Sequence, residues 1–382
     1  MDVHKGTRAI KAAKASYGER AEGPSDAVGP RGTDGASRRG AACLSGRSGR
    51  RANAIIAGLA VFMVVAAGVS LMLGRYPIAP GEAVGMLLST FLPLDQTWTA
   101  QQETLFFNVR LPRIVLALMV GCCLAAAGAA FQGTFQNPLV SPDILGASQG
   151  AAFGAALAIL SGAGALAVSG SAFAFSIATV LLVLLISSRA KGNRILVTVL
   201  AGVMISSLFS AGVSFTKLIA DPTDQLPAIT YWLMGSLTGA KLDINLGITM
   251  IPMVAGLAVL LALRWRINVL TMGDDEASTM GIDARRLRLA IILAATLITA
   301  ASVAVTGMIG WVGLVIPHLS RMIVGCDYRK LLPASMLMGA SFLLIVDNIS
   351  RLATTAEIPI GILTAFVGAP FFLYLITRKK KL

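Results

Sequence analysis

The chain has 382 residues, 55% of them hydrophobic and 13% charged, with a formal net charge of +13. An average soluble domain carries about 25% charged residues, so this composition excludes an ordinary soluble enzyme or binding module and predicts a chain solvated mostly by lipid. The excess of basic residues does not indicate nucleic-acid binding, because these residues stand at the ends of apolar runs, as cations do on the cytoplasmic side of a membrane.

Residues 1–52 form the first region, a basic stretch rich in glycine, serine and alanine with few large apolar side chains. Such a segment cannot bury enough apolar surface to fold, so we expect a disordered cytoplasmic tail. The pairs Arg38–Arg39 and Arg50–Arg51 would suit a twin-arginine signal. The apolar run beyond them is long enough to span a membrane and lacks a small-residue cleavage site, which favours a retained tail.

Apolar runs recur along residues 53–382 and predict a single transmembrane domain. Several approach the roughly 20 residues that a helix needs to cross a bilayer. The predicted fold class is therefore all-α, a polytopic membrane protein of about ten transmembrane helices. Some runs are short, glycine-rich or interrupted by proline, as in Gly307–His318, and indicate broken or re-entrant helices. The runs are Ala54–Leu73, Ile114–Phe131, Ile144–Leu160, Ala172–Ile186, Ile195–Leu218, Leu246–Leu263, Leu287–Val305, Ile309–Ile323, Leu332–Val346 and Gly361–Ile376.

The loops between the runs alternate in charge, and this alternation predicts the orientation of the chain. Basic loops face the cytoplasm in membrane proteins. Both termini are then expected in the cytoplasm, as an even number of crossings requires. The basic set includes Arg189, Lys191, Arg194, Arg264, Arg266, Arg285, Arg286, Arg288, Arg329, Lys330 and residues 378–381, and the opposite set includes Asp95, Glu103, Asp221, Asp224 and Glu357.

Three stretches carry the most specific motifs in the chain. The first is Arg110-Leu111-Pro112-Arg113, followed by Asn137-Pro138-Leu139, Pro142-Asp143 and Leu145–Gly150; the second is Leu270–Ala277 with Met280-Gly281-Ile282; the third is Gly310–His318, Leu331-Leu332-Pro333, Glu357–Gly361 and Gly368–Phe372. Together they resemble the FecCD-type permeases, the family of type II ABC importers for iron-siderophore, haem and cobalamin. The resemblance runs from about residue 55 to the C-terminus.

This resemblance implies that residues 53–382 are a permease domain in a bacterial or archaeal cytoplasmic (inner) membrane. The implied cargo is a metal chelate, a ferric siderophore first and haem or cobalamin next. The implied partners are a second permease subunit, identical or different, two ATPase subunits, a periplasmic or lipid-anchored substrate-binding protein, and membrane lipid.

Features of the sequence also indicate that the chain is a transport subunit and not an enzyme. It contains no G-x-x-x-x-G-K-[ST] motif, so we expect no bound cofactor here and expect ATP and magnesium on the partner ATPase. No convergent catalytic set stands out, and the cysteines are not spaced as metal ligands. The alternative is a secondary transporter driven by an ion gradient, for which Asp347 would be the sole near-membrane acid.

Arg110, Arg113 and Arg351 lie near the predicted outer ends of spans, where the charge rule disfavours them. In the resembled family, arginines at the matching positions pair with glutamates on the two lobes of the substrate-binding protein. A guanidinium suits that role because its fork meets a carboxylate at two points. The alternative is that Arg351 pairs with Asp347 four residues earlier on the same helix and that the other two reach lipid headgroups.

The segment Gly273-Asp274-Asp275-Glu276-Ala277, continuing to Met280-Gly281, predicts a short cytoplasmic helix. Asp274 is expected to cap it, the acids suit its positive N-terminal end, and Gly281 is expected to end it. The resemblance implies that this helix couples the permease to the ATPase. The alternative from the residues alone is a plain connector.

Gly202, Ser206, Ser210 and Ser214 recur every four residues and therefore share one face of a helix. Close helix contact and lining of a translocation path both suit such a face, and the resemblance favours the path. The loop residues Gly192 and Asn193 stand where the resembled cobalamin permease narrows its cytoplasmic gate with a hydroxyl pair. This position is the predicted gate, although its residues depart from that pattern.

Overall fold

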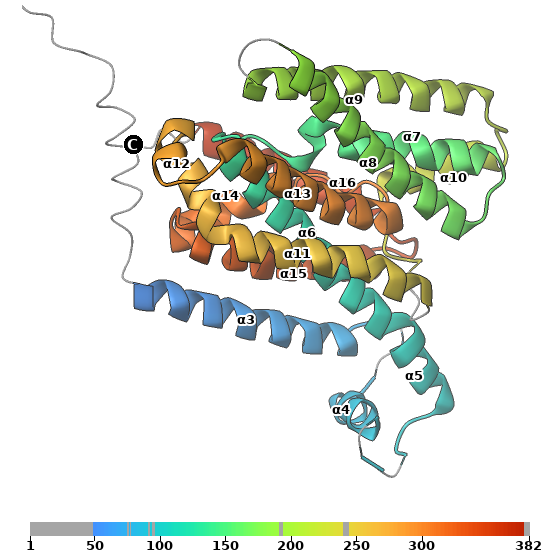
Figure 1. Cartoon of the computed structure of the whole chain (residues 1–382). Helices are drawn as coiled ribbons and strands as arrows, with labels where there is room; N and C mark the ends of the chain where they lie inside the picture. Colours follow the sequence, from blue (N-terminus) through green and yellow to red (C-terminus); the bar gives the residue numbers. More distant parts are fainter. Residues whose placement is uncertain are drawn as a thin grey trace, which may run out of the picture. The chain divides into compact units, whose positions relative to one another are not determined.

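The computed structural model describes residues 49–377, apart from residues 75, 77, 91, 94–95, 191–193 and 240–243. Within these residues the regular structure is helical, without a strand, which confirms the predicted all-α class (Figure 1). The predicted tail lies outside the described residues up to residue 48 and stays a prediction. The helical segments are α3 (Gly49–Met72), α4 (Pro80–Ser89), α5 (Ala100–Leu105), the π-helical turn η1 (Phe106–Arg110), α6 (Leu111–Thr134), the 3-10 turn η2 (Pro142–Leu145), α7 (Ala147–Leu160), α8 (Ala165–Arg189), α9 (Arg194–Ile219), α10 (Gln225–Met234), α11 (Ile244–Leu270), α12 (Asp274–Thr279), α13 (Ala284–Thr306), α14 (Val312–Val324), α15 (Tyr328–Leu352) and α16 (Ile360–Thr377).

Apolar helices in the described part of the chain match the predicted spans one for one. Seven are long and apolar enough to cross a membrane: α3, the continuous helix from α5 through α6, α8, α9, α11, α13 and α15. Three shorter apolar helices, α7, α14 and α16, complete the set. The chain is therefore a polytopic membrane protein, while the cytoplasmic position of its termini stays a prediction.

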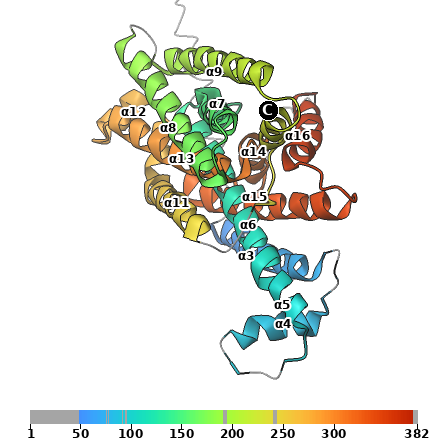
Figure 2. The ribbon, with the colours of Figure 1, turned by 90° about the vertical axis from the view of Figure 1, so that its right-hand side faces the viewer.

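Helix α6 forms the centre of the bundle, between α11, α13, α14 and α15 (Figures 1 and 2). In its long helix 78% of the most apolar window is buried inside the chain, against 6% for α3 at the edge. Glycines make this central position possible, because a Cβ at Gly128 would overlap the carbonyl of Gly313 in α14, and one at Gly121 would overlap that of Gly339 in α15. Backbones that approach so closely gain dispersion contacts that lipid cannot replace.

The π-helical turn η1 lies directly before Pro112 in the long helix. Proline has no N–H and its ring meets the carbonyl one turn earlier, so a regular α-helix cannot run through it undisturbed. A widened turn absorbs this mismatch without breaking the helix. As a result Arg110 and Arg113 both stand at one end of α6.

Helices α10, α13 and α16 end or begin at one junction inside the bundle. The N–H of Ser236 donates to the carbonyl of Thr306 at 2.7 Å, and the N–H of Ile360 donates to that of Gly235 at 2.9 Å. Gly235 and Gly307 have φ of 72° and 69°, which favour glycine. The predicted break is confirmed here, because α13 stops at Thr306 and α14 begins only at Val312. The freed backbone groups are satisfied within the protein, as a membrane requires.

Candidate transport and coupling sites

A buried ion-pair network joins α6, α15 and the segment before α16 at one end of the bundle, which we call the arginine end. The Nε of Arg113 donates to Oδ1 of Asp347 at 2.9 Å, and its two terminal nitrogens donate to Glu357 at 3.0 and 2.8 Å. Arg113 is 6% exposed and Asp347 is fully buried. A two-point guanidinium–carboxylate contact of this kind is among the strongest hydrogen-bonded pairs.

Arg351 extends this network to α3. Its Nε lies 3.2 Å from Oδ2 of Asp347, one helical turn earlier in α15. A terminal nitrogen donates to Oγ of Ser70 at 3.1 Å and also to Asn348. Ser70 in turn donates to Asn348 at 2.8 Å. Asp347 therefore lies between two guanidinium groups, one from α6 and one from its own helix.

Arg110, in contrast, is bonded to backbone carbonyls. It is 6% exposed, and its terminal nitrogens donate to the carbonyls of Leu71, at 2.8 Å, of Met72, at 3.3 Å, and of Tyr76. These carbonyls lie at and just beyond the end of α3, where helical partners run out. Arg110 thus fastens the end of α3 to the start of α6.

All three predicted docking arginines therefore have partners inside the chain. For Arg351 the predicted alternative, a pair with Asp347, is present in the structure. Arg113 does not reach out to headgroups but binds two acids within the chain. Their role toward a substrate-binding protein stays a prediction that a single chain does not test. Asp347 is a paired carboxylate, bound by Arg113 and Arg351.

The predicted coupling segment forms the short helix α12 at the opposite end of the bundle, which we call the α12 end (Figure 1). Its side chains are exposed except for Ala277, which is fully buried and anchors the helix. Asp274 binds Arg288 of α13 at two points, with nitrogen–oxygen distances of 2.6 and 3.2 Å. This ion pair connects the short helix α12 to the long helix α13.

One detail of the prediction for α12 is wrong. The N-cap residue is Gly273, with φ of 131°, and its lack of a side chain leaves the helix without a side-chain cap. Asp274 is instead the first helical residue, and its carboxylate binds Arg288. The predicted end is confirmed. Gly281 has φ of 74°, its N–H donates to Ser278, and the N–H of Ile282 donates to Ala277. These two bonds form a Schellman motif, which favours glycine at that position.

The predicted path face on α9 divides into two halves. Gly202 is buried, and a Cβ there would overlap the carbonyl of Ile144 in η2. Ser206 is half-buried, whereas Ser210 and Ser214 are exposed. Ser206 and Ser214 each donate to the carbonyl four residues earlier. The first half of the face thus serves close contact, and the second half is open to a path or a partner.

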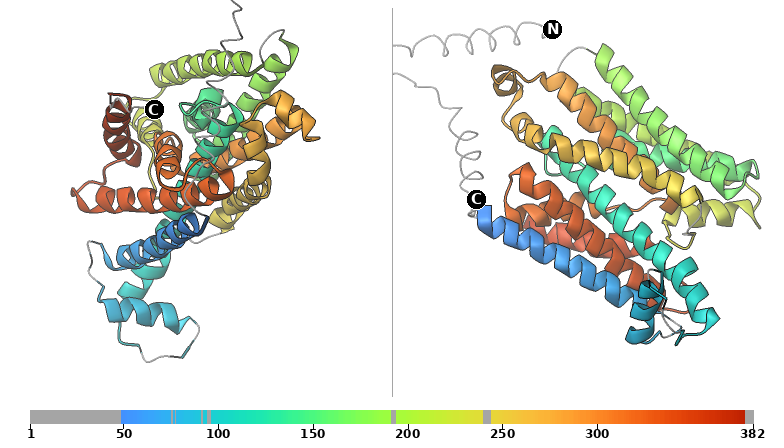
Figure 3. Two further views of the ribbon diagram at one scale, coloured as in Figure 1. Left: turned by 90° about the vertical axis from the view of Figure 1, so that its left-hand side faces the viewer. Right: turned by 60° about the horizontal axis from the view of Figure 1, so that its bottom comes forward.

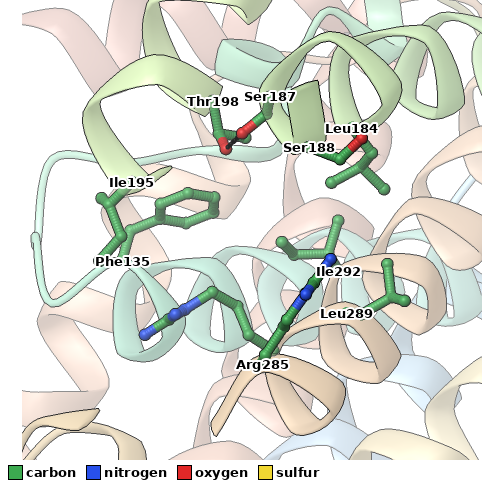
Figure 4. Close-up of a pocket in the computed structure, with 10 residues that line it drawn as sticks. Phe135, Leu184, Ser187, Ser188, Ile195, Thr198, Arg285, Leu289 and Ile292 are labelled. Carbon is green, nitrogen blue, oxygen red and sulfur yellow. Dashed lines mark hydrogen bonds between the residues drawn. The ribbon is translucent and has the colours of Figure 1, made fainter. Parts of the chain in front are cut away.

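The predicted gate residues Gly192 and Asn193 lie outside the described residues. The helices that flank them, α8 and α9, enclose with α13 a cavity of about 150 Å³. Figure 4 shows the apolar side chains of Leu184 and Ile292 at this cavity, with the hydroxyls of Ser187 and Thr198 bonded to each other. Arg288, the partner of Asp274, also lines it. The ion pair of Asp274 with Arg288 thus links the coupling helix to this cavity.

Glu357, Arg288 and Ser70 were not among the site residues predicted from the sequence. The sequence places Arg288 in a basic loop, Glu357 in an acidic loop and at the start of the motif Glu357–Gly361, and Ser70 in an apolar run. The distribution of charges along the chain does not indicate which distant helices these side chains contact. The available signal for Glu357 and Arg288 was that each is a charged residue close to the end of a predicted span.

A bundle of membrane-spanning helices, some of them broken and in close contact through small residues, is an architecture found in many membrane transport proteins. Comparison with known proteins narrows this class. Residues 60–378 match the model of the FecCD transport family. The chain is 41% identical over 330 residues to the molybdate import system permease protein MolB of Haemophilus influenzae, covering 86% of this chain and 96% of the relative.

Other relatives carry different cargo names. The chain is 39% identical to the hemin transport system permease protein HmuU of Yersinia pestis, covering 80% of this chain and 93% of the relative. It is 38% identical to the cobalamin import system permease protein BtuC of Halobacterium salinarum, covering 83% and 85%. A solved metal-chelate type ABC transporter in an inward-facing conformation matches with a TM-score of 0.76 at 41% identity, covering 85% of this chain and 99% of that chain.

The chain belongs to the FecCD transport family, as its motifs predicted. It is a multi-pass membrane protein and a transport subunit of the ABC permease type. The relatives give no support to the alternative of an ion-gradient-driven transporter.

Proposed function

We propose that this chain is the membrane-spanning permease of an ATP-driven importer that takes up a metal chelate, a ferric siderophore in the first place, across the cytoplasmic membrane. Two permease subunits, identical or pseudo-symmetric, would enclose the path. Two ATPases would bind at the α12 end, and a substrate-binding protein at the arginine end. The observation that carries the proposal is α12, an exposed acidic helix fastened to a span in a chain of this family.

The contacts of α12 supply a mechanism for coupling. ATP and magnesium would act on the separate ATPase, and their effect would reach this chain as a push on α12. Ala277 anchors α12 in the bundle, and Asp274 pulls on Arg288 of α13. Because Arg288 also lines the cavity between α8, α9 and α13, a shift of α12 would change the shape of that cavity. A small displacement could then open or close the gate position.

At the arginine end, Arg351 is the best candidate for contact with the binding protein. Within the described residues, the Nε and one terminal nitrogen of Arg351 have partners, so its other terminal nitrogen remains for a carboxylate from outside. Arg110 and Arg113 would join the docking surface only if their internal bonds rearranged. The half-exposed Glu357 marks where such a rearrangement would begin, since 32% of its side chain is exposed.

The path face on α9 suits a large cargo that must pass through without binding tightly. Ser210 and Ser214 are small, uncharged and exposed, so they offer weak contacts and no charged ligand. Selection would then rest with the binding protein. Molybdate is a second candidate cargo, because the relative MolB, which is 41% identical, is named for molybdate import. Haem and cobalamin remain candidates through the relatives named for them.

Uptake of labelled ferric siderophore, molybdate, haem and cobalamin tests the proposal in cells that lack the gene. Wild type should restore one of these activities. Asp274→Lys, which places a cation against Arg288, should insert in the membrane but fail to restore uptake, whereas the exposed control Thr279→Lys on the same helix should restore it. If no tested cargo depends on the gene, the chelate assignment is wrong. If Asp274→Lys works normally, the assignment of α12 to coupling is wrong.

A further inference from the structure

Helix α4 belongs to a small lateral unit that has its own apolar core. Ala83 and Met86 of α4 are buried together with Ile78, Trp98 and Phe106. Gly85 lies against the ring of Trp98, where a Cβ would not fit. The carboxylate of Glu82 accepts a hydrogen bond from Gln102 at 2.8 Å. One face of α4 is therefore fixed by contacts, and its opposite face must point outward.

That outward face is apolar, and it carries no charged side chain. Val84, Leu87 and Leu88 are 52%, 42% and 45% exposed. Their spacing of three and four residues places them on one side of the helix, and we call them the α4 apolar face. A helix in water shows the reverse arrangement, with polar residues outward and apolar residues toward the core.

The position of α4 indicates what covers this face. Figures 1, 2 and 3 agree that α4 lies beside the Met72 end of α3, on the side of the bundle away from α9. Helix α3 is long and apolar enough to cross a membrane, and only 6% of its apolar window is buried inside the chain, so most of its surface is open to lipid. The α4 apolar face therefore lies beside the end of a lipid-facing span, at the level where the bilayer is expected to end.

Arg110 fixes the position of α4 relative to the end of α3. Its guanidinium holds the last carbonyls of α3 and that of Tyr76, which lies in the connection to α4. The chain between α3 and α4 is thus fastened where it leaves the span. The lateral unit cannot swing freely away from the plane in which α3 ends.

We propose that α4 is an interfacial helix that lies in the leaflet at the Met72 end of α3, with Val84, Leu87 and Leu88 inserted among the lipid acyl chains. Helices of this kind bury one apolar face at the boundary between headgroups and hydrocarbon. The partner is the lipid bilayer itself. The helix would widen the contact of the permease with the bilayer beyond its spans. It would also set how deep the arginine end lies relative to the membrane surface.

Photocrosslinking in native membranes tests this proposal with the full-length chain. A benzoyl-phenylalanine in place of Leu88 is irradiated, and the adducts are identified by the intact mass of the purified chain. The same replacement at Val84 repeats the measurement one turn earlier. Thr90 provides the matched control, because it is exposed and lies two residues, or about 200°, around the helix from Leu88.

We expect phospholipid adducts at Leu88 and Val84, in several-fold higher yield than at Thr90. Adducts with a second copy of the chain or with another protein would overturn the proposal and identify a protein interface. Equal yields at Leu88 and Thr90, or no adduct at Leu88, would overturn it as well, since the face would then lie in water.

Discussion

Charged side chains gather at both ends of this helix bundle, but in opposite environments. At the arginine end, Asp347 is fully buried between Arg113 and Arg351. At the α12 end, Asp274 pairs with Arg288 while 57% of its side chain is exposed. A buried charge that loses its partner is costly, whereas an exposed pair is weak and screened by water. The first network therefore holds helices together, and the second is left available to a partner.

The largest expected effect comes from removing the acid at the centre of the buried network. Asp347→Ala leaves two largely buried guanidinium groups without their shared counter-charge, which should lower the free energy of unfolding by about 3–5 kcal/mol. Thermal unfolding of the purified protein in one detergent measures the loss. Asp275→Ala, which removes an exposed acid of α12, serves as the control and should change little. Equal melting temperatures for the two variants would contradict the contrast drawn here.

A smaller effect is expected at the edge of the same network. Glu357→Gln keeps the shape of the side chain but removes its charge, and because a third of the side chain is exposed the loss should be about 1 kcal/mol. Since Glu357 and Asp347 share Arg113, their effects should not be additive. Unfolding of the two single variants and the double variant measures this coupling. Simple addition would mean that the acids act independently.

The end of helix α12 depends on the conformation of Gly281, which lies two residues beyond its last helical residue. Gly281→Ala places a side chain at φ of 74° in open space, so only backbone strain remains, about 1 kcal/mol. Hydrogen exchange of the α12 amides should become faster. Gly58→Ala in α3 is the matched control, because it also meets open space but has no positive φ. Unchanged exchange in Gly281→Ala would show that the Schellman bonds do not hold the helix.

The smallest effect on stability, with a clear effect on function, is expected for the pair of Asp274 with Arg288. Asp274→Asn removes a charge that is 57% exposed but keeps an oxygen that accepts from Arg288, so the free energy of unfolding should change by less than about 1 kcal/mol. Under the proposed coupling role it should nevertheless lower ATP hydrolysis by the reconstituted importer. The charge-reversed pair Asp274→Arg with Arg288→Asp should recover part of that activity. A large drop in melting temperature would place this pair with the structural network instead.

The sequence alone determined the features that depend on near neighbours in the chain. The apolar runs predicted the seven helices that are long and apolar enough to cross a membrane and the three shorter apolar helices, because length and hydropathy suffice to place such helices in the sequence. Gly281 predicted the end of α12, and the four-residue spacing offered the pair of Asp347 with Arg351 as an alternative. Each of these inferences needs only a few consecutive residues.

Tertiary structure alone decided which distant groups meet. Arg113 binds Asp347 and Glu357 across 234 and 244 residues, and Arg351 reaches Ser70 across 281 residues. Hydropathy and helical spacing assign each residue to a helix or a loop, but they do not specify which helices become neighbours. The close approach of Gly128 to Gly313, and the other contacts of α6, set that arrangement. They brought the predicted docking residues Arg113 and Arg351 into a buried network, since charged groups at crowded helix ends must find partners once water is excluded.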